Sequence, residues 1–370
     1  MLRNIPMFRK TALSVLISAG ALAASAQGTD SSRKAADSSK PAPAAPVSIT
    51  GSADFYYRYD FTKANNGLTS FTSSHDEFKL GMATVKLEHK TAKLDMVADL
   101  GFGPRAQEFA YNDQGIVQAI KQLYISYSPN AWVKFTGGTW ATHIGYEVLD
   151  AYANRNYSMS YMFTNGPFSH TGVRADFTVG KSGIMIGVSN PTDWRTPPSS
   201  QQSNKNMIAQ YSYAPSDNFH LYLNYVGGRD VNDNKIHQYD LVATIKASSQ
   251  FSVGLNGTYN HSSYVADNYA TGHNWYGGAA YLNLDPTSWF GLTLREEYFS
   301  DKDGIKLHPV GGATGANVIA STLSAMFKVD GFIFIPEFRI DNASETLFTK
   351  NDGTATKTDP SFLLAAIYSF

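Results

Sequence analysis

The feature that most constrains the fold is an alternation of apolar and polar residues with a period of two, repeated along most of the chain. Between residues 49 and 61, Phe55, Tyr57 and Tyr59 fall on one face of an extended strand, while Asp54 and Arg58 fall on the other. Similar runs recur at residues 94–102, 122–127, 133–136, 173–179, 219–225, 251–260 and 332–339. The pattern predicts an all-β protein of antiparallel strands separated by turns.

The composition of the two faces separates a soluble sheet from a membrane-embedded one. One face is aromatic and rich in small residues, whereas the other carries Asp, Arg, Asn, Lys and Thr. A soluble sandwich or lectin-like domain would bury one of these faces, and a packed core cannot hold so many charges. We therefore expect a transmembrane β-barrel with lipid outside and water in the lumen. The length favours about sixteen strands, and fourteen or eighteen are also compatible.

The N-terminus predicts the compartment. A basic start is followed by a short apolar run and by Ala24-Ser25-Ala26, which is a small-residue cleavage site. We predict a signal peptide over residues 1–26, a disordered periplasmic tail over 27–46 and the barrel over 47–370. No later stretch is apolar and long enough for a transmembrane helix. These features point to the outer membrane of a Gram-negative cell.

The last strand gives a second sign of outer-membrane assembly. Phe362, Leu364, Ala366, Tyr368 and Phe370 alternate, and the given sequence stops at Phe370. A terminal aromatic residue on an alternating strand resembles the signal that the barrel assembly machinery recognises. We expect this strand to pair with the first strand, and we expect outer-membrane lipids and the assembly machinery as partners.

A long irregular segment lies between the strand that ends near Thr139 and the strand that starts near His170. Long loops in compact domains are often functional, and a loop folded into a barrel narrows the lumen. Length alone does not fix the direction of the loop, so an ordinary external loop is an equal alternative. If the segment folds inward, it forms a constriction whose candidate residues are Tyr146, Glu147, Asn154 and Arg155.

Charged residues on the inward face are candidates for the pore lining. By parity they are Arg58, Lys134, Arg174, Arg295, Glu297, Glu337 and Arg339. Such charges shape the field that a solute meets, or they form cross-strand ion pairs that fix the register of the strands. Both signs are present, so the sequence leaves the ion preference open.

Several of these segments also carry a family resemblance. The motifs are Gly145-Tyr146-Glu147, the stretches 154–158 and 166–173, the strand 294–301 and the strand 336–341. Their order over residues 47–370 resembles the OmpL-like outer-membrane β-barrel porins. The resemblance implies a porin-type channel of unassigned cargo, with no catalytic residues to transfer. Ile340 stands beside Arg339 where the motif would place an aromatic residue, which does not disturb the alternation.

We predict a porin that forms a water-filled channel for passive diffusion of small hydrophilic solutes. Two alternatives stay open: a non-conducting barrel that acts as surface receptor, adhesin or scaffold, and an outer-membrane hydrolase. No motif supports an enzyme, a cofactor or a metal site. Without the predicted signal peptide, which holds three basic and no acidic residues, 27 basic and 31 acidic residues leave a net charge of −4, which argues against nucleic acid as a partner. A homo-oligomer is compatible with the sequence, which does not reveal the solute or whether the lumen is plugged.

Overall fold

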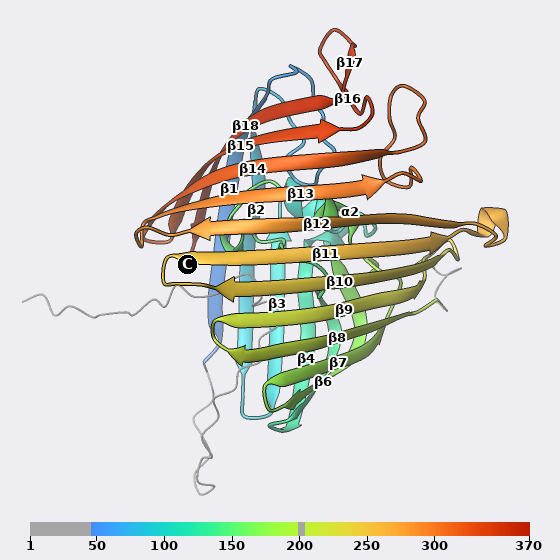
Figure 1. Ribbon diagram of the computed structural model, residues 1–370. Coiled ribbons are helices and arrows are strands. Elements are labelled where there is room, and N and C mark those ends of the chain that lie inside the picture. Colours follow the sequence, from blue (N-terminus) through green and yellow to red (C-terminus); the bar gives the residue numbers. More distant parts are fainter. Residues whose placement is uncertain (1–45, 199–203) are drawn as a thin grey trace, which may run out of the picture.

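The chain forms one closed antiparallel barrel, seen from the side in Figure 1. The computed structural model describes residues 46–198 and 204–370. Within these residues sixteen strands close the barrel, which confirms the predicted fold class and strand number. The predicted signal peptide and the tail up to residue 45 lie outside the described residues, so both stay predictions.

Each barrel strand pairs with its neighbours in sequence, and β16 and β17 form a separate hairpin outside the barrel. The barrel strands are β1 (Ser48–Asp60), β2 (Glu77–Lys90), β3 (Leu94–Phe102), β4 (Ile120–Asn130), β5 (Val133–Ala141), β6 (Ser169–Val179), β7 (Ser182–Ser189), β8 (Asn206–Ser216), β9 (Phe219–Arg229), β10 (Lys235–Lys246), β11 (Phe251–Ser263), β12 (Gly272–Leu284), β13 (Phe290–Asp301), β14 (Ala316–Val329), β15 (Phe332–Ala343) and β18 (Thr358–Ser369). The remaining elements are α1 (Pro104–Phe109), α2 (Tyr161–Asn165), the 3₁₀ turns η1 (Gly115–Ala119), η2 (Ala151–Ala153) and η4 (Val265–Asp267), and the hairpin of β16 (Phe348–Thr349) and β17 (Ala355–Thr356). No helix among the described residues is long and apolar enough to cross a membrane.

The last strand closes the barrel against the first, as predicted. Ser52 of β1 stands opposite Ser369 of β18. Beyond them, Gly51 donates its N–H to the carbonyl of Phe370 at 3.1 Å, and Phe370 donates its own N–H back at 3.0 Å. The chain therefore pairs to its final residue, which removes the free edge that an open sheet would present.

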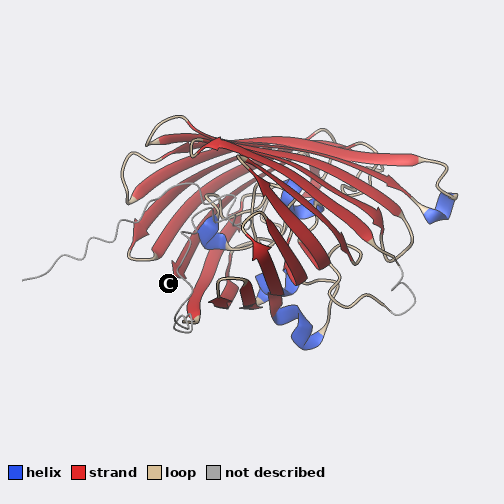
Figure 2. Ribbon diagram, turned by 90° about the horizontal axis from the view of Figure 1, so that it is seen from below, coloured by secondary structure: helices blue, strands red, loops and turns tan. Residues whose placement is uncertain are grey.

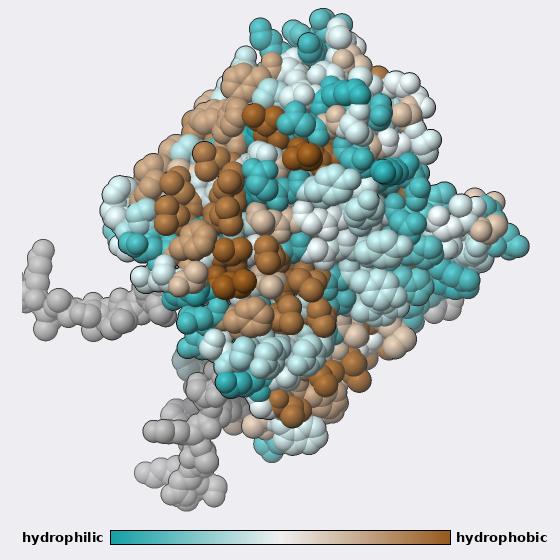
Figure 3. Space-filling view, viewed as in Figure 1, coloured by the Kyte–Doolittle hydropathy of each residue, from teal (hydrophilic) through white to brown (hydrophobic). Residues whose placement is uncertain are grey.

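The outer face is apolar and carries aromatic residues near both ends of the strands. Tyr225, Tyr239, Tyr259 and Tyr276 are direct cross-strand neighbours on β9 to β12. The space-filling view shows apolar side chains gathered over part of the near wall, with hydrophilic side chains over the ends of the strands on the right (Figure 3). Aromatic rows at the limits of an apolar band are typical of a barrel in a lipid bilayer.

The two ends of the barrel differ in the length of their connections. At one end, here called the short-turn end, the connections are brief, such as residues 131–132, 180–181 and 217–218. At the other, the long-loop end, residues 61–76, 103–119, 142–168 and 302–315 connect neighbouring strands. Loops and short helices lie beneath the arched sheet in Figure 2.

The lumen is less polar than the sequence led us to expect. Leu363, Ala365 and Ile367 of β18 point inward and pack with Ile335 of β15 in a buried cluster. Ala151 and Tyr157 of the segment 142–168 pack on these inward residues. This part of the wall is therefore buried on its inner side and meets lipid on its outer side. The expectation of a wet inner face is therefore wrong for residues 363–367 of β18, whereas Asp359 and Ser361 of the same strand line a crevice.

Candidate functional site

Residues 142–168, here called the inner loop, fold into the barrel. The side chains of Tyr157, Met159 and Tyr161 are fully buried, which an external loop would not allow. Within the loop, the hydroxyl of Ser160 accepts the N–H of Phe163 at 3.0 Å and caps α2. The loop lies against the inner wall of β12, β13, β15 and β1, as its contacts show.

Two glutamates of the wall hold the loop through its backbone. Glu337 of β15 accepts the N–H of Tyr157 at 2.8 Å and that of Ser158 at 3.1 Å. Glu297 of β13 accepts the N–H groups of Tyr161 and Met162, both at 2.8 Å. Each carboxylate thus binds two consecutive amides with both of its oxygens. Hydrogen bonds to a charged acceptor are about twice as strong as neutral ones.

Two arginines of the same wall bind the carbonyls between these amides. Arg295 of β13 donates to the carbonyl of Ser158 at 2.7 Å and forms an ion pair with Glu147 of the loop at 2.5 Å. Arg339 of β15 donates to the carbonyl of Met159 at 2.7 Å. We call Arg295, Glu297, Glu337 and Arg339 the wall clamp. Its two negative side chains bind N–H groups of the loop backbone, and its two positive side chains bind carbonyl groups of the same stretch.

Two loop tyrosines extend this contact. The hydroxyl of Tyr157 donates to Asp54 of β1 at 2.5 Å, and that of Tyr161 donates to Asp341 of β15 at 2.8 Å. Burial raises the pKa of both tyrosines well above its ordinary value, so both hydroxyls keep their protons and act as donors.

The remaining parts of the loop are anchored elsewhere on the wall. Near its start, the ring of Tyr146 stacks on Tyr281 of β12, with ring centroids 4.1 Å apart. Further on, Arg155 binds both carboxylate oxygens of Asp285, at 2.8 and 2.9 Å, and donates to Thr293 at 2.7 Å. Asp285 follows β12 at the short-turn end, so the loop reaches from the long-loop end to the opposite turns.

An apolar cluster packs behind the loop on the long-loop side. Phe71 and Phe109 come from two other loops and meet Met159, Phe163 and Phe168 of the inner loop. Such a cluster stabilises the loops against one another, because large aromatic residues dominate the energetics of buried contacts.

A cavity of about 1350 Å³ remains on the short-turn side of the inner loop. Its boundary includes Tyr146, Glu147, Asn154 and Arg155, the four residues predicted for a constriction. The structure thus places them together at the lumen, and their role in solute passage stays a proposal.

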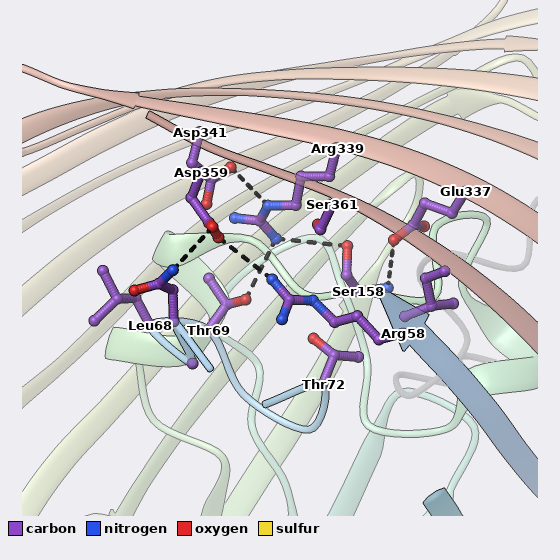
Figure 4. Close-up of a pocket in the computed structure, with 13 residues that line it drawn as sticks. Arg58, Leu68, Thr69, Thr72, Ser158, Glu337, Arg339, Asp341, Asp359 and Ser361 are labelled. Carbon is purple, nitrogen blue, oxygen red and sulfur yellow. Dashed lines mark hydrogen bonds and ion pairs between the residues drawn. The ribbon is translucent and has the colours of Figure 1, made fainter. Parts of the chain in front are cut away.

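The predicted pore-lining residues separate into three groups. Lys134 and Arg174 line the cavity. Arg58 lies in a small crevice that Glu337 and Arg339 also line, and it pairs there with Asp359 at 3.3 Å (Figure 4). It also pairs with Asp60 at 3.1 Å. The four residues of the wall clamp are at most 5% exposed, because the inner loop covers them. The structure therefore places these four as anchors of the loop, away from the large cavity.

Sequence reasoning missed the partners of the wall clamp within the loop. Tyr157 and Tyr161 both lie in the long irregular segment, where the sequence does not distinguish them from their neighbours as anchors. Their spacing gave no periodic signal, since an irregular loop bound through its backbone needs no repeat. Among the described residues, no group of three or more His, Cys, Asp or Glu side chains is placed to hold a metal ion.

The model of one protein family, described as "Putative beta-barrel porin-2, OmpL-like", matches residues 46–370. The chain belongs to this porin family. The match confirms the resemblance seen in the motifs and covers the whole barrel. No curated protein matches the sequence significantly.

Solved structures of outer membrane proteins share the fold of this family member. The outer membrane channel DcaP of Acinetobacter baumannii is 13% identical with a TM-score of 0.59, covering 88% of this chain and 97% of its own. The trimer form of the outer membrane protein OmpT of Vibrio cholerae is 10% identical with a TM-score of 0.61, covering 89% and 100%. An anion-selective porin from Comamonas acidovorans is 8% identical with a TM-score of 0.58, covering 88% and 99%. At these identities the likeness establishes the fold alone.

Proposed function

We propose that this outer-membrane porin is a passive diffusion channel for small hydrophilic solutes, narrowed by its inner loop. The observation that carries the proposal is the cavity of about 1350 Å³ inside a closed barrel, bounded by charged side chains of both the loop and the wall. A barrel of this strand number is wide enough for an aqueous path beside an infolded loop.

The orientation follows from the two kinds of connection. Outer-membrane barrels have short periplasmic turns and longer external loops. The short-turn end then faces the periplasm, together with the N-terminal tail that precedes β1. On this reading the inner loop enters from outside, and the cavity lies on the periplasmic side of it.

The apolar cluster behind the inner loop supports a second candidate function. Phe71, Phe109 and Phe168 occupy part of the lumen at the long-loop end. A lumen plugged in this way would leave a non-conducting barrel that acts as a surface receptor, adhesin or scaffold. We favour a channel over this alternative because the cavity is large, and over an enzyme because the family is a porin family.

Assembly partners complete the proposal. The strand that ends on Phe370 would present its aromatic terminus to the barrel assembly machinery, and the apolar outer face would meet outer-membrane lipids. A homo-oligomer is compatible with this outer face, and one similar solved structure is described as a trimer form.

Liposome swelling tests the channel proposal directly. Proteoliposomes with the refolded protein should swell in sugars and amino acids at rates that fall with solute size. A correctly folded barrel that gives no swelling above protein-free liposomes would favour the receptor or scaffold.

A further inference from the structure

The cavity holds an excess of positive charge in two separate places. On the wall, Asp176 of β6 pairs with Arg174 at 3.3 Å, and Lys134 of β5 stands directly opposite Asp176 in the register. By the inner loop, Asp285 is bound by Arg155 at 2.8 Å and lies 3.8 Å from Lys328. Each place therefore has two cations around one carboxylate.

The other carboxylates of the cavity do not offset this excess. Glu147 forms its ion pair with the buried Arg295 and also accepts the N–H of Ser160 at 2.8 Å. Asp217 and Asp330 lie in the turns at the mouth, where Lys181 and Lys246 also line the cavity. A cation that entered would meet carboxylates whose charge is already neutralised. An anion would meet cations whose charge a single carboxylate only partly neutralises.

Aromatic and apolar surface lies between the charged places. Tyr222 of β9 and Tyr146 of the inner loop line the cavity, and Tyr146 is backed by the buried ring of Tyr281. Tyr152 of the inner loop lines it too and is 38% exposed, although the loop around it is largely buried. Such surface binds an apolar body, which a purely ionic filter would not do.

We propose that this cavity is a binding site for amphipathic organic anions, in which a carboxylate is attached to an aromatic or apolar body. The carboxylate meets Lys134 and Arg174 or the cations around Asp285, and the apolar body lies on the tyrosines. The inference deepens the proposed channel function by naming its solute class, but binding itself does not depend on conduction.

Two measurements on the purified barrel test the proposal. In calorimetric titrations in detergent, phenylacetate should bind more tightly than acetate, and phenethylammonium, a cation of similar shape, should not bind. In planar bilayers with a potassium chloride gradient, the reversal potential should show chloride preference, and phenylacetate should reduce the current. Equal binding of phenethylammonium, or no binding of phenylacetate, would overturn the proposal.

Variants locate the effect in the cavity. One of two cavity variants should weaken phenylacetate binding roughly fivefold or more, a factor of the order expected for losing one unit charge at about 4 Å in water. The variant is Lys134→Gln with Arg174→Gln if the carboxylate meets the wall cations, and Lys328→Gln if it meets the cations around Asp285. Lys350→Gln in the exposed turn between β16 and β17 is the matched control and should bind as the unchanged protein does.

The outcomes separate this inference from the channel proposal. Conduction without preference for phenylacetate would overturn the inference and leave the channel intact. Binding of phenylacetate by a barrel that never conducts would keep the site and overturn the channel. Unchanged binding in both cavity variants would show that the anion lies elsewhere.

Discussion

Replacing Glu337 by glutamine tests the wall clamp at its most specific point. The side chain keeps its shape but loses its charge, and one of its two acceptor oxygens becomes an amide donor. That donor then faces the N–H of Tyr157 or Ser158, which the carboxylate had accepted at 2.8 and 3.1 Å. Charge-assisted hydrogen bonds contribute about 1.5–3 kcal/mol each, and a buried unsatisfied donor costs about 1–3 kcal/mol.

We therefore expect Glu337→Gln to weaken the attachment of the inner loop by roughly 2–4 kcal/mol. A change of 2 kcal/mol shifts the equilibrium between attached and released loop by a factor of roughly 30. The barrel itself should stay folded, because its strands pair independently of the loop. Its band on unheated gels should keep the mobility of a folded barrel.

Single-channel recording is the assay. The variant should show a larger mean conductance and more current noise than the unchanged protein, as the loop leaves the wall. The matched control is Glu345→Gln, an exposed carboxylate in the loop after β15 that lies 3.8 Å from Lys357. If Glu337→Gln conducts as steadily as the control, the clamp does not hold the loop and the reasoning is wrong.

Three further predictions follow from other contacts. Gly254→Ala should displace the start of the inner loop, because an added Cβ would lie 2.4 Å from the ring of Tyr146. We expect the free energy of unfolding to fall by about 1–3 kcal/mol and the conductance to change, whereas an unchanged conductance would contradict this contact. Burial lowers the pKa of His143 to about 4 and thereby favours its neutral form. Above pH 6.5 the buried neutral ring does not lower the free energy of unfolding. As the pH falls from 6.5 through 4, protonation favours the unfolded state and the free energy of unfolding should decrease by roughly 3 kcal/mol. Hydrogen exchange of the inner loop should show this acid sensitivity, and an equal sensitivity in His143→Gln would refute the assignment. Deleting Phe370 removes both hydrogen bonds to Gly51 and the terminal aromatic, so the amount of folded protein in the outer membrane should fall, whereas an unchanged amount would argue against its role in assembly.

Much of the fold could be predicted from the sequence because alternation reports directly on the two faces of a strand. Phe338 and Tyr368 are exposed on the outer face as their parity requires, while Glu337 points inward. The inward apolar residues of β18 were less evident. The run from Phe362 to Tyr368 is almost continuously apolar, which is a signature of a strand buried on both faces. Its lipid-facing residues alone fit an ordinary barrel strand, so they do not reveal the cover on the inner side.

The candidate site was harder to predict because it depends on contacts between distant segments. The parity of Glu297 and Glu337 places them inside the barrel, but it does not show that a loop covers them. That cover is a contact with Tyr157 and Tyr161, about 140 to 180 residues away in the chain. Loop length suggested a constriction, and only the three-dimensional arrangement fixed its direction.

Conduction through a lumen that a fixed loop narrows can be recorded on the purified, folded protein in planar bilayers. We expect steady conductance steps that scale linearly with voltage, because the wall clamp holds the inner loop in one position. A protein that is folded by gel mobility and protease resistance but never gives such steps would show that the barrel is not an open channel.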